Sequence, residues 1–440
     1  MSDLVQTKTP PRAVVLGGYG LIGAACMRAL KSAGFVVTGV GRDVDAANRV
    51  DPDCDWLIRD IAQATAKDWA RDLAGVDVVV NASGALQDGA RDNLAAIHEG
   101  AVHALIDGLA DQHTRFIQIS AVGVSKDAPT AFMSTKARGD TALMASPLDW
   151  IILRPTLVLG RAAYGGTALL RAAAAMPLIG VQVLPDTAVQ TVALDDVAQA
   201  VVQAAQGNIA THTLADLTAP DVHSFANLTA KIRNWLGFTP WRHTITAAHP
   251  LVSFTGKIAD ALGWLGWRSP LRSTALNVLA DGIKGDPTAW QMAGGAPCRS
   301  LDQTLRDMPA TVQDRWFSRL FLLLPIAIAT LSLFWLLSGI IGLLRADVAL
   351  KVLTSRDIGE GLAALSVYGG ALIDIALGAI LLFRRHARRA CLGMIAVSLV
   401  YLTAGTILTP DIWADPLGPF VKVLPGITLA ATVMALLDDR

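Results

Sequence analysis

Four glycines near the start of the chain have the spacing of a phosphate-binding turn. Gly17, Gly20 and Gly23 recur at three-residue intervals, and Gly18 with the last two also fits the pattern G-x-G-x-x-G. Glycine is required there because a tight bend, close approach to a pyrophosphate and close helix packing all exclude a Cβ atom. The pattern predicts a dinucleotide site at Gly17, Gly18, Tyr19, Gly20, Leu21, Ile22 and Gly23.

The segments around this turn are the ones that such a site requires. The apolar run 13–16 suits a buried parallel strand, and residues 24–34 predict a helix whose free N–H groups would face the phosphates. Strand and helix patterns then alternate through residues 35–40, 77–84, 115–123, 149–160 and 192–205. This alternation predicts an α/β domain with a doubly wound (Rossmann) parallel sheet.

Residues after the second predicted strand bear on the choice of coenzyme. An acidic residue there would hold the ribose 2′-hydroxyl of NAD, whereas an arginine accommodates the 2′-phosphate of NADP. Arg42 comes first and can bind phosphate through two hydrogen bonds, so NADP(H) is favoured, while Asp43 keeps NAD(H) possible. Asp60 is placed either to meet the adenine or to cap a helix.

Residues 10–215 resemble the extended and atypical short-chain dehydrogenase/reductases, including the group similar to the 39-kilodalton accessory subunit of respiratory complex one. The motifs that carry the resemblance are GGYGLIG, NASG, the IS of RFIQISAVG, F-x-x-x-K, LRPTLVLG and LDDVAQA. The resemblance implies a coenzyme channel lined by Asn81, Ala82 and Ser83. It also implies an active-site hydroxyl at Ser120, a ribose-binding Lys136, and Pro155 beside the nicotinamide.

The family's catalytic tyrosine is missing. It stands four residues before the lysine and exchanges a proton during hydride transfer, but Phe132 occupies that position here. Losing a general acid or base typically costs about 10²–10⁴-fold in rate. Tyr164, in a glycine-rich loop after the strand with Pro155, is the candidate replacement, whereas His98 and His103 are expected to be ordinary helix residues.

The last third of the chain predicts a membrane domain. Residues 320–344 contain no Asp, Glu, Lys, Arg or His, and three further apolar stretches follow at 361–383, 390–409 and 416–437. A helix needs about 20 apolar residues to cross a bilayer, so four spans are expected. Residues 384–389 contain four arginines, which places this loop and both termini in the cytosol.

Residues 315–440 look like the DoxX-like family of four-helix membrane proteins, through FWLLSGIIGLL, GGALIDIALGAILLF and PLGPFVKVLPGITLAATVMALL. Asp374 lies within the second span, where it is expected to make a contact between helices, to pair with a basic residue or to handle a proton. Between the two parts, residues 216–314 are expected to form a substrate lobe and connector. Trp264 and Trp267 there suit either a lipid interface or core packing.

Composition excludes several other classes of protein. The 37 basic residues balance 37 acidic ones, which removes the charge pattern of a nucleic-acid binder. The four cysteines are far apart, so neither a disulfide framework nor a zinc site is indicated. No cleaved signal peptide is expected ahead of the first strand. The expected location is therefore the bacterial cytoplasmic membrane, with the nucleotide domain in the cytosol.

Two functions follow from these features. The first is a membrane-anchored NAD(P)(H)-dependent oxidoreductase of atypical mechanism that acts on a membrane-associated carbonyl or quinone. The second is a scaffold or redox sensor that holds NADP(H) without consuming it, which Phe132 would explain.

Overall fold

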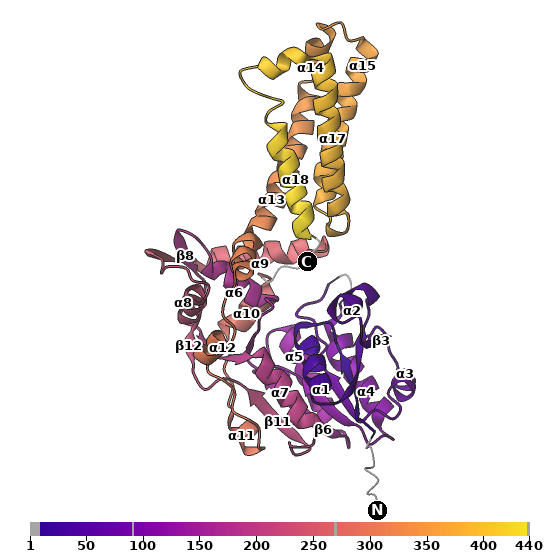
Figure 1. Cartoon of the computed structure of the whole chain (residues 1–440), viewed down its shortest axis with the longest axis vertical. Coiled ribbons are helices and arrows are strands. Elements are labelled where there is room, and N and C mark those ends of the chain that lie inside the picture. The colour runs from indigo at the N-terminus through magenta and orange to yellow at the C-terminus, as the bar shows by residue number, and fades with distance from the viewer. Residues whose placement is uncertain (1–8, 90–91, 268–270, 438–440) are drawn as a thin grey trace, which may run out of the picture. The chain divides into compact units, whose positions relative to one another are not determined.

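The computed structural model describes residues 9–89, 92–267 and 271–437. It divides into two compact units, of which the first comprises Met1–Asp260 and Pro270–Arg315 and the second Ala261–Ser269 and Trp316–Arg440. The predicted lobe at 216–314 falls largely in the same unit as the nucleotide domain. Figure 1 shows the elements of both units along the chain.

The first unit is built on a parallel sheet, seven strands wide in the described residues, with the order β11-β6-β5-β4-β1-β2-β3. Each neighbouring pair in it runs parallel. The predicted doubly wound fold is therefore confirmed. Its strands are β1 (Arg12–Leu16), β2 (Val36–Gly41), β3 (Asp55–Ile58), β4 (Val78–Asn81), β5 (Arg115–Ile119), β6 (Asp149–Pro155) and β11 (Thr213–Leu217).

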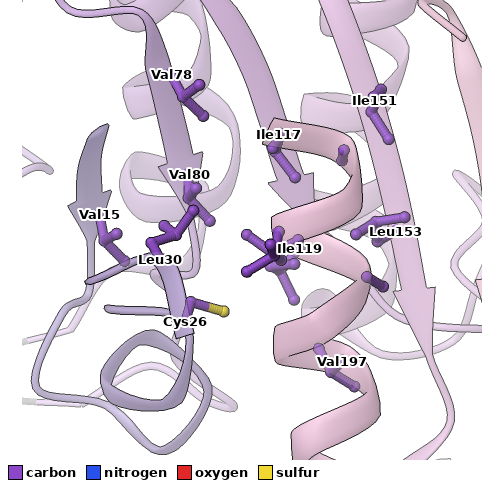
Figure 2. Close-up of a cluster of buried hydrophobic side chains, with 14 of the residues drawn as sticks. Val15, Cys26, Leu30, Val78, Val80, Ile117, Ile119, Ile151, Leu153 and Val197 are labelled. Carbon is purple, nitrogen blue, oxygen red and sulfur yellow. The ribbon is translucent and has the colours of Figure 1, made fainter. Parts of the chain in front are cut away.

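Helices bury both faces of this sheet. Side chains alternate between the faces along each strand, so successive apolar residues of one strand join different clusters. Val78 and Val80 join the cluster that contains residues of α1 and α7, and Figure 2 shows part of that cluster. Val79 joins the cluster on the opposite face, with residues of α3, α4 and α5. These helices are α1 (Leu21–Ser32), α3 (Ala66–Asp72), α4 (Ala101–Leu109), α5 (Ala131–Met144) and α7 (Leu194–Ala205); the short α2 (Val44–Val50) follows β2, and a π-helical turn, η1 (Ala96–Gly100), precedes α4.

The remaining elements of the first unit are short strands and helices, many of them around a separate apolar cluster. Leu228 and Ile232 of α8, Leu170 of α6 and Leu305 of α12 are buried together there. The strands are β7 (Leu157–Leu159), β8 (Ile179–Gln182), β9 (Ala188–Val189), β10 (Thr191–Ala193), β12 (His223–Ser224) and β13 (His243–Thr246). The helices are α6 (Gly166–Ala174), α8 (Phe225–Trp235), α9 (His249–Trp264), α10 (Ser273–Ala280), α11 (Thr288–Met292) and α12 (Leu301–Asp307).

The second unit is helical, and in its described part three helices are long and apolar enough to cross a membrane. They cover Val312–Leu344, Glu360–Leu381 and Arg384–Leu408. The fourth predicted span is shorter than expected. Its helix α18 begins at Val423 rather than near residue 416 and has 15 residues. At about 1.5 Å per residue it is about 22 Å long, less than a hydrocarbon core of about 30 Å. The elements are α13 (Val312–Leu344), α14 (Ala346–Thr354), α15 (Glu360–Ala364), η2 (Leu365–Gly369), α16 (Gly370–Leu381), η3 (Arg384–His386), α17 (Ala387–Leu408), η4 (Pro410–Ala414) and α18 (Val423–Leu437).

Small residues let α13 and α16 approach each other closely. A Cβ atom on Gly339 would lie 2.4 Å from the Ala371 carbonyl oxygen, so no larger residue fits without displacing the helix. Asp374 accepts a hydrogen bond of 2.9 Å from the Ser338 hydroxyl. The partner of Asp374 is thus a serine on the neighbouring helix, which is the interhelical contact among the expected alternatives.

Trp264, which ends α9, and Trp267, which follows that helix, have different surroundings. Trp267 donates its indole N–H to the Leu382 carbonyl oxygen at 2.7 Å and packs on the core of the second unit. The Trp264 side chain is 83% exposed. Of the two expected alternatives, core packing therefore applies to Trp267, whereas Trp264 lies at a surface exposed to solvent or lipid.

Candidate functional site: the carboxyl ends of the central strands

The glycine turn after β1 has no room for a side chain at Gly17 or Gly23. A Cβ on Gly23 would lie 2.2 Å from the Gly17 carbonyl oxygen, and one on Gly17, whose φ is +70°, would lie 2.8 Å from the Ser83 Cα. The Gly20 N–H closes the turn by donating to the Gly17 oxygen at 2.8 Å. The turn leads directly into α1, whose first N–H groups have no carbonyl partners within the helix. These residues fit the pyrophosphate of a dinucleotide.

Tyr19 connects the turn to the end of β2. Its ring occupies the space where Gly41 would carry a Cβ, at 2.2 Å, and its hydroxyl accepts a hydrogen bond of 3.3 Å from the Arg42 N–H. Gly18 lies against Met27 and Trp56, and Leu21 and Ile22 begin α1. The turn is therefore in direct contact with the position that the sequence predicts to distinguish NADP(H) from NAD(H).

Three polar residues predicted near the adenosine end have defined partners. The Arg42 guanidinium forms an ion pair with Asp92, with 2.6 Å between Nη2 and Oδ1. Asp43 caps α2, because its carboxylate accepts the Ala46 N–H at 2.9 Å. Asp60 accepts the Ala62 N–H at 3.1 Å and so caps a turn rather than a helix. Sequence reasoning missed Asp92, which lies 50 residues from Arg42.

The segment after β4 lies against the glycine turn. Asn81 is buried, donates its amide to Gln118 at 2.9 Å, and accepts hydrogen bonds from the Ser83 N–H and hydroxyl. The Ala82 N–H donates to the Leu16 carbonyl oxygen at 3.1 Å, extending the pairing of β4 with β1. Asn81 thus holds Ser83 beside Gly17.

A buried carboxylate supports the predicted active-site serine. The Ser120 hydroxyl donates to Asp140 at 2.5 Å, and Arg154 lies 3.6 Å from the same carboxylate. Asp140 is completely buried, and burial raises its pKa despite these partners. Sequence reasoning missed Asp140, although its position four residues after Lys136 places both on one face of α5.

Lys136 and Phe132 lie one helical turn apart on α5, as the motif requires. The Lys136 ammonium donates to the Ile119 carbonyl oxygen at 3.0 Å and lies 6.0 Å from the centre of the Phe132 ring. Burial lowers the pKa of Lys136, although Asp140 opposes the shift. A Cβ on Gly84 would be 3.7 Å from the Lys136 Nζ, so the loop after β4 also reaches this group.

His98 belongs to the same group of side chains, which sequence reasoning did not anticipate. Its Nε2 accepts the Ala85 N–H at 3.2 Å, so its proton is on Nδ1, which donates to the Thr135 hydroxyl at 2.9 Å. The ring meets Phe132 edge to face at 5.6 Å. Burial and the charge of Lys136 lower the pKa of His98 to about 3, so the ring is neutral at physiological pH.

Pro155 and Tyr164 occupy different environments. Pro155 ends β6, and its carbonyl oxygen accepts the Val122 N–H at 3.3 Å, which places it beside the segment after β5. The Tyr164 side chain is 62% exposed, just before α6, where its carbonyl oxygen accepts the Thr167 hydroxyl at 2.9 Å. Within the residues that the structure describes, no hydrogen bond or ring contact joins the Tyr164 side chain to Ser120 or Lys136.

The chain is similar to two sequence families in separate regions. Residues 17–208 match the NAD(P)H-binding family model, and residues 332–431 match the DoxX-like family model. No curated protein matches the chain. With the apolar helices, the second match associates the chain with a membrane.

Several solved structures share the fold of the first unit. WbmG of Bordetella bronchiseptica, solved with NAD, is 15% identical and has a TM-score of 0.53, covering 72% of this chain and 97% of that one. A UDP-glucuronic acid 4-epimerase from Bacillus cereus, solved with UDP-glucuronic acid and NAD, is 15% identical with a TM-score of 0.50, covering 70% and 99%. The terminal R domain of the myxalamid PKS-NRPS pathway is 16% identical with a TM-score of 0.51, covering 71% and 91%.

These identities establish likeness of fold alone. The two family matches go further for their own regions. The chain therefore combines a region similar to the NAD(P)H-binding family, on a doubly wound parallel sheet, with a C-terminal region similar to the DoxX-like family.

Proposed function

We propose that this protein is a membrane-anchored NAD(P)H-dependent oxidoreductase whose acceptor is a membrane-associated quinone or carbonyl compound. The observation that carries the proposal is the glycine turn without space for a Cβ, followed across the sheet by Ser120, Asp140 and Lys136. When bound, a reduced nicotinamide coenzyme supplies a hydride to an acceptor. Arg42 favours NADP(H), and NAD(H) is the alternative.

Different residues of the chain would hold the different parts of the coenzyme and the acceptor. Residues 17–23 would hold the pyrophosphate, and Asn81, Ala82 and Ser83 would line the coenzyme's path across the strand ends. Lys136 would hold the nicotinamide ribose, and Pro155 would pack near the nicotinamide. The Ser120 hydroxyl, which donates to Asp140 in this structure, would turn from that carboxylate to donate to the acceptor oxygen when the acceptor binds.

Phe132 favours a quinone over a simple ketone as acceptor. A reduced ketone leaves an alkoxide, which is strongly basic and needs a proton from the protein, and Phe132 has none to give. A reduced quinone leaves a hydroquinone anion, whose charge is delocalised over the ring and which water can protonate. Lys136 can still stabilise that anion, because burial lowers the lysine's pKa and makes its N–H groups stronger donors.

The test is coenzyme oxidation by the full-length protein in lipid nanodiscs, followed at 340 nm with a short-chain quinone or an aliphatic ketone. We expect the quinone to be reduced, and Lys136→Met to lower turnover about a hundredfold or more. Lys126→Met is the control, because Lys126 is exposed and ten residues away. Phe132→Tyr should raise turnover of the ketone. Quinone reduction that survives Lys136→Met would contradict the assignment.

A scaffold or redox sensor that holds NADP(H) is the second candidate, and Phe132 is the feature that favours it. Such a protein would retain NADPH through purification and leave it unconsumed with every quinone and carbonyl offered. Its affinity for NADPH would still depend on residues 17–23, so binding without turnover separates it from the enzyme.

Tyr164 is proposed as the replacement proton donor, since it lies in a loop after the strand that carries Pro155. Its exposed hydroxyl would have to approach the acceptor when substrate binds. Tyr164→Phe should lower turnover of a ketone acceptor, whose reduced form needs a proton from the protein, about a hundredfold, with coenzyme affinity unchanged. Turnover equal to that of the unsubstituted protein would exclude Tyr164 from the reaction.

We place the protein in the bacterial cytoplasmic membrane as a multi-pass protein. The four arginines at 384–389 favour the cytosolic side for that loop, and NAD(P)H is available to the nucleotide domain there. An acceptor dissolved in the bilayer would be consistent with this location.

A further inference from the structure

We propose that Asp92 is a specificity-determining residue that opposes the binding of NADP(H) by competing with its 2′-phosphate for Arg42. The proposal rests on the coenzyme site proposed above and assigns to it a residue that its motifs do not include. Its basis is the 2.6 Å ion pair between the Arg42 Nη2 and the Asp92 Oδ1.

Arg42 is held where a ribose 2′-substituent is expected. It follows β2 directly, its N–H donates to the Tyr19 hydroxyl, and Tyr19 belongs to the glycine turn. The backbone of Arg42 is therefore fixed against the phosphate-binding residues. Its guanidinium is the group that the sequence assigns to the 2′-phosphate.

Asp92 reaches Arg42 from a separate part of the chain. It lies after β4, where the Gly89 N–H donates to the Asp92 carbonyl oxygen at 2.9 Å and the Asp92 N–H donates to the Gly89 carbonyl oxygen at 3.2 Å. These two hydrogen bonds fix the Asp92 backbone. Its carboxylate thus meets Arg42 from a defined position.

The other nearby acidic side chains are committed elsewhere. Asp43 caps α2, and Asp60 caps the turn after β3. The charge of Asp60 also acts on Arg42, but the acid that forms a direct ion pair with the guanidinium is Asp92. A carboxylate at this position repels a 2′-phosphate and can accept a hydrogen bond from a 2′-hydroxyl.

The consequences differ for the two coenzymes. NADP(H) must break the ion pair and place a phosphate of charge near −2 beside Asp92, whereas NAD(H) can leave the pair intact. Removing the carboxylate charge should therefore free the Arg42 guanidinium for the 2′-phosphate of NADP(H). It should also remove a carboxylate oxygen that could accept a hydrogen bond from the 2′-hydroxyl of NAD(H). The ratio of the two affinities is the quantity that Asp92 controls.

The experiment measures the dissociation constants of NADPH and NADH by fluorescence titration of the full-length protein in detergent. Asp92→Asn keeps the size of the side chain and should raise the affinity for NADPH relative to NADH about tenfold or more. Asp302→Asn is the matched control, because Asp302 forms an ion pair of the same 2.6 Å length with Lys231 in α8. The control should leave the ratio unchanged.

Arg42→Ala provides the second variant. In that background Asp92→Asn should change the ratio less, because the competition for the guanidinium is gone. A ratio that is unchanged or lower in Asp92→Asn would overturn the proposal. If the unsubstituted protein binds neither coenzyme, the proposed function fails instead, which keeps the two failures distinct.

Discussion

His98 illustrates how a residue's chemistry depends on its surroundings. On sequence alone it is a helix histidine, but its two ring nitrogens are both engaged and its ring contacts Phe132 beside Lys136. It joins the loop after β4, through Ala85, to the second turn of α5, through Thr135. We interpret His98 as a positioning residue that holds the loop on which the coenzyme would rest.

The lowered pKa of His98 predicts a loss of stability in acid. The unfolded chain binds a proton near pH 6.5, whereas the folded one does so only near pH 3, so the free energy of unfolding falls as the pH drops through this window. By pH 5 the loss from this residue is about 2 kcal/mol. His98→Gln should flatten the decline of the thermal midpoint between pH 7 and pH 5, and His103→Gln should not.

If the midpoint falls equally steeply in both variants and in the unsubstituted protein, His98 is not the group that titrates. His103→Gln is a suitable control for His98→Gln, because His103 lies in the neighbouring α4 and is exposed.

At the scale of elements, the glycine turn couples β1, α1 and the segment after β4. Its closure depends on Gly23 packing on the Gly17 carbonyl oxygen, and Gly17 in turn lies against Ser83. A methyl group at position 23 must therefore displace the turn from its observed position. This is a geometric requirement of the strand, turn and helix as a unit.

Gly23→Ala should weaken NADPH and NADH binding about tenfold or more, because overpacking of this kind costs about 1–3 kcal/mol. Titration of the full-length protein in detergent measures the change. Gly166→Ala is the control, because a Cβ there meets nothing within 4 Å. Unaltered affinity in Gly23→Ala would mean that coenzyme does not bind at this turn.

At the scale of the whole molecule, the length of α18 decides how the chain is threaded through a membrane. Among the residues that the structure describes, three helices are long enough to cross, and the apolar helix α18 has 15 residues. If α18 crosses with the help of local thinning of the bilayer, the C-terminus returns to the side of the arginine-rich loop. If it does not, the C-terminus stays on the opposite side.

We expect α18 to cross, because residues 384–389 and the nucleotide domain then share the cytosolic side. A fluorescent protein that matures only in the cytosol should be fluorescent when fused after Arg440. The same reporter fused after Asp415, in a chain cut at that point, should be dark. A dark fusion at Arg440 would show three crossings and place the C-terminus outside.

The sequence by itself determined the features that local patterns encode. The glycine spacing, the apolar strands that alternate with helices and the apolar runs after residue 320 each occupy one continuous stretch, so the doubly wound fold and the membrane helices followed from them. The positions of Ser83, Ser120 and Lys136 along the chain could also be identified, because the motifs that carry the family resemblance contain them.

Only the tertiary structure decided which of these residues meet. Asp92 pairs with Arg42 across 50 residues in the sequence. Asp140 accepts a hydrogen bond from the Ser120 hydroxyl across 20 residues, and Ser338 donates one to Asp374 across 36. Sequence spacing does not encode such contacts. Parallel strands joined by helices bring distant strand ends to one edge of a sheet, and packed helices such as α13 and α16 bring distant residues into contact. The charge environment of Arg42 and the neutral state of His98 are therefore properties of the packed molecule, since burial and neighbouring charges arise only there.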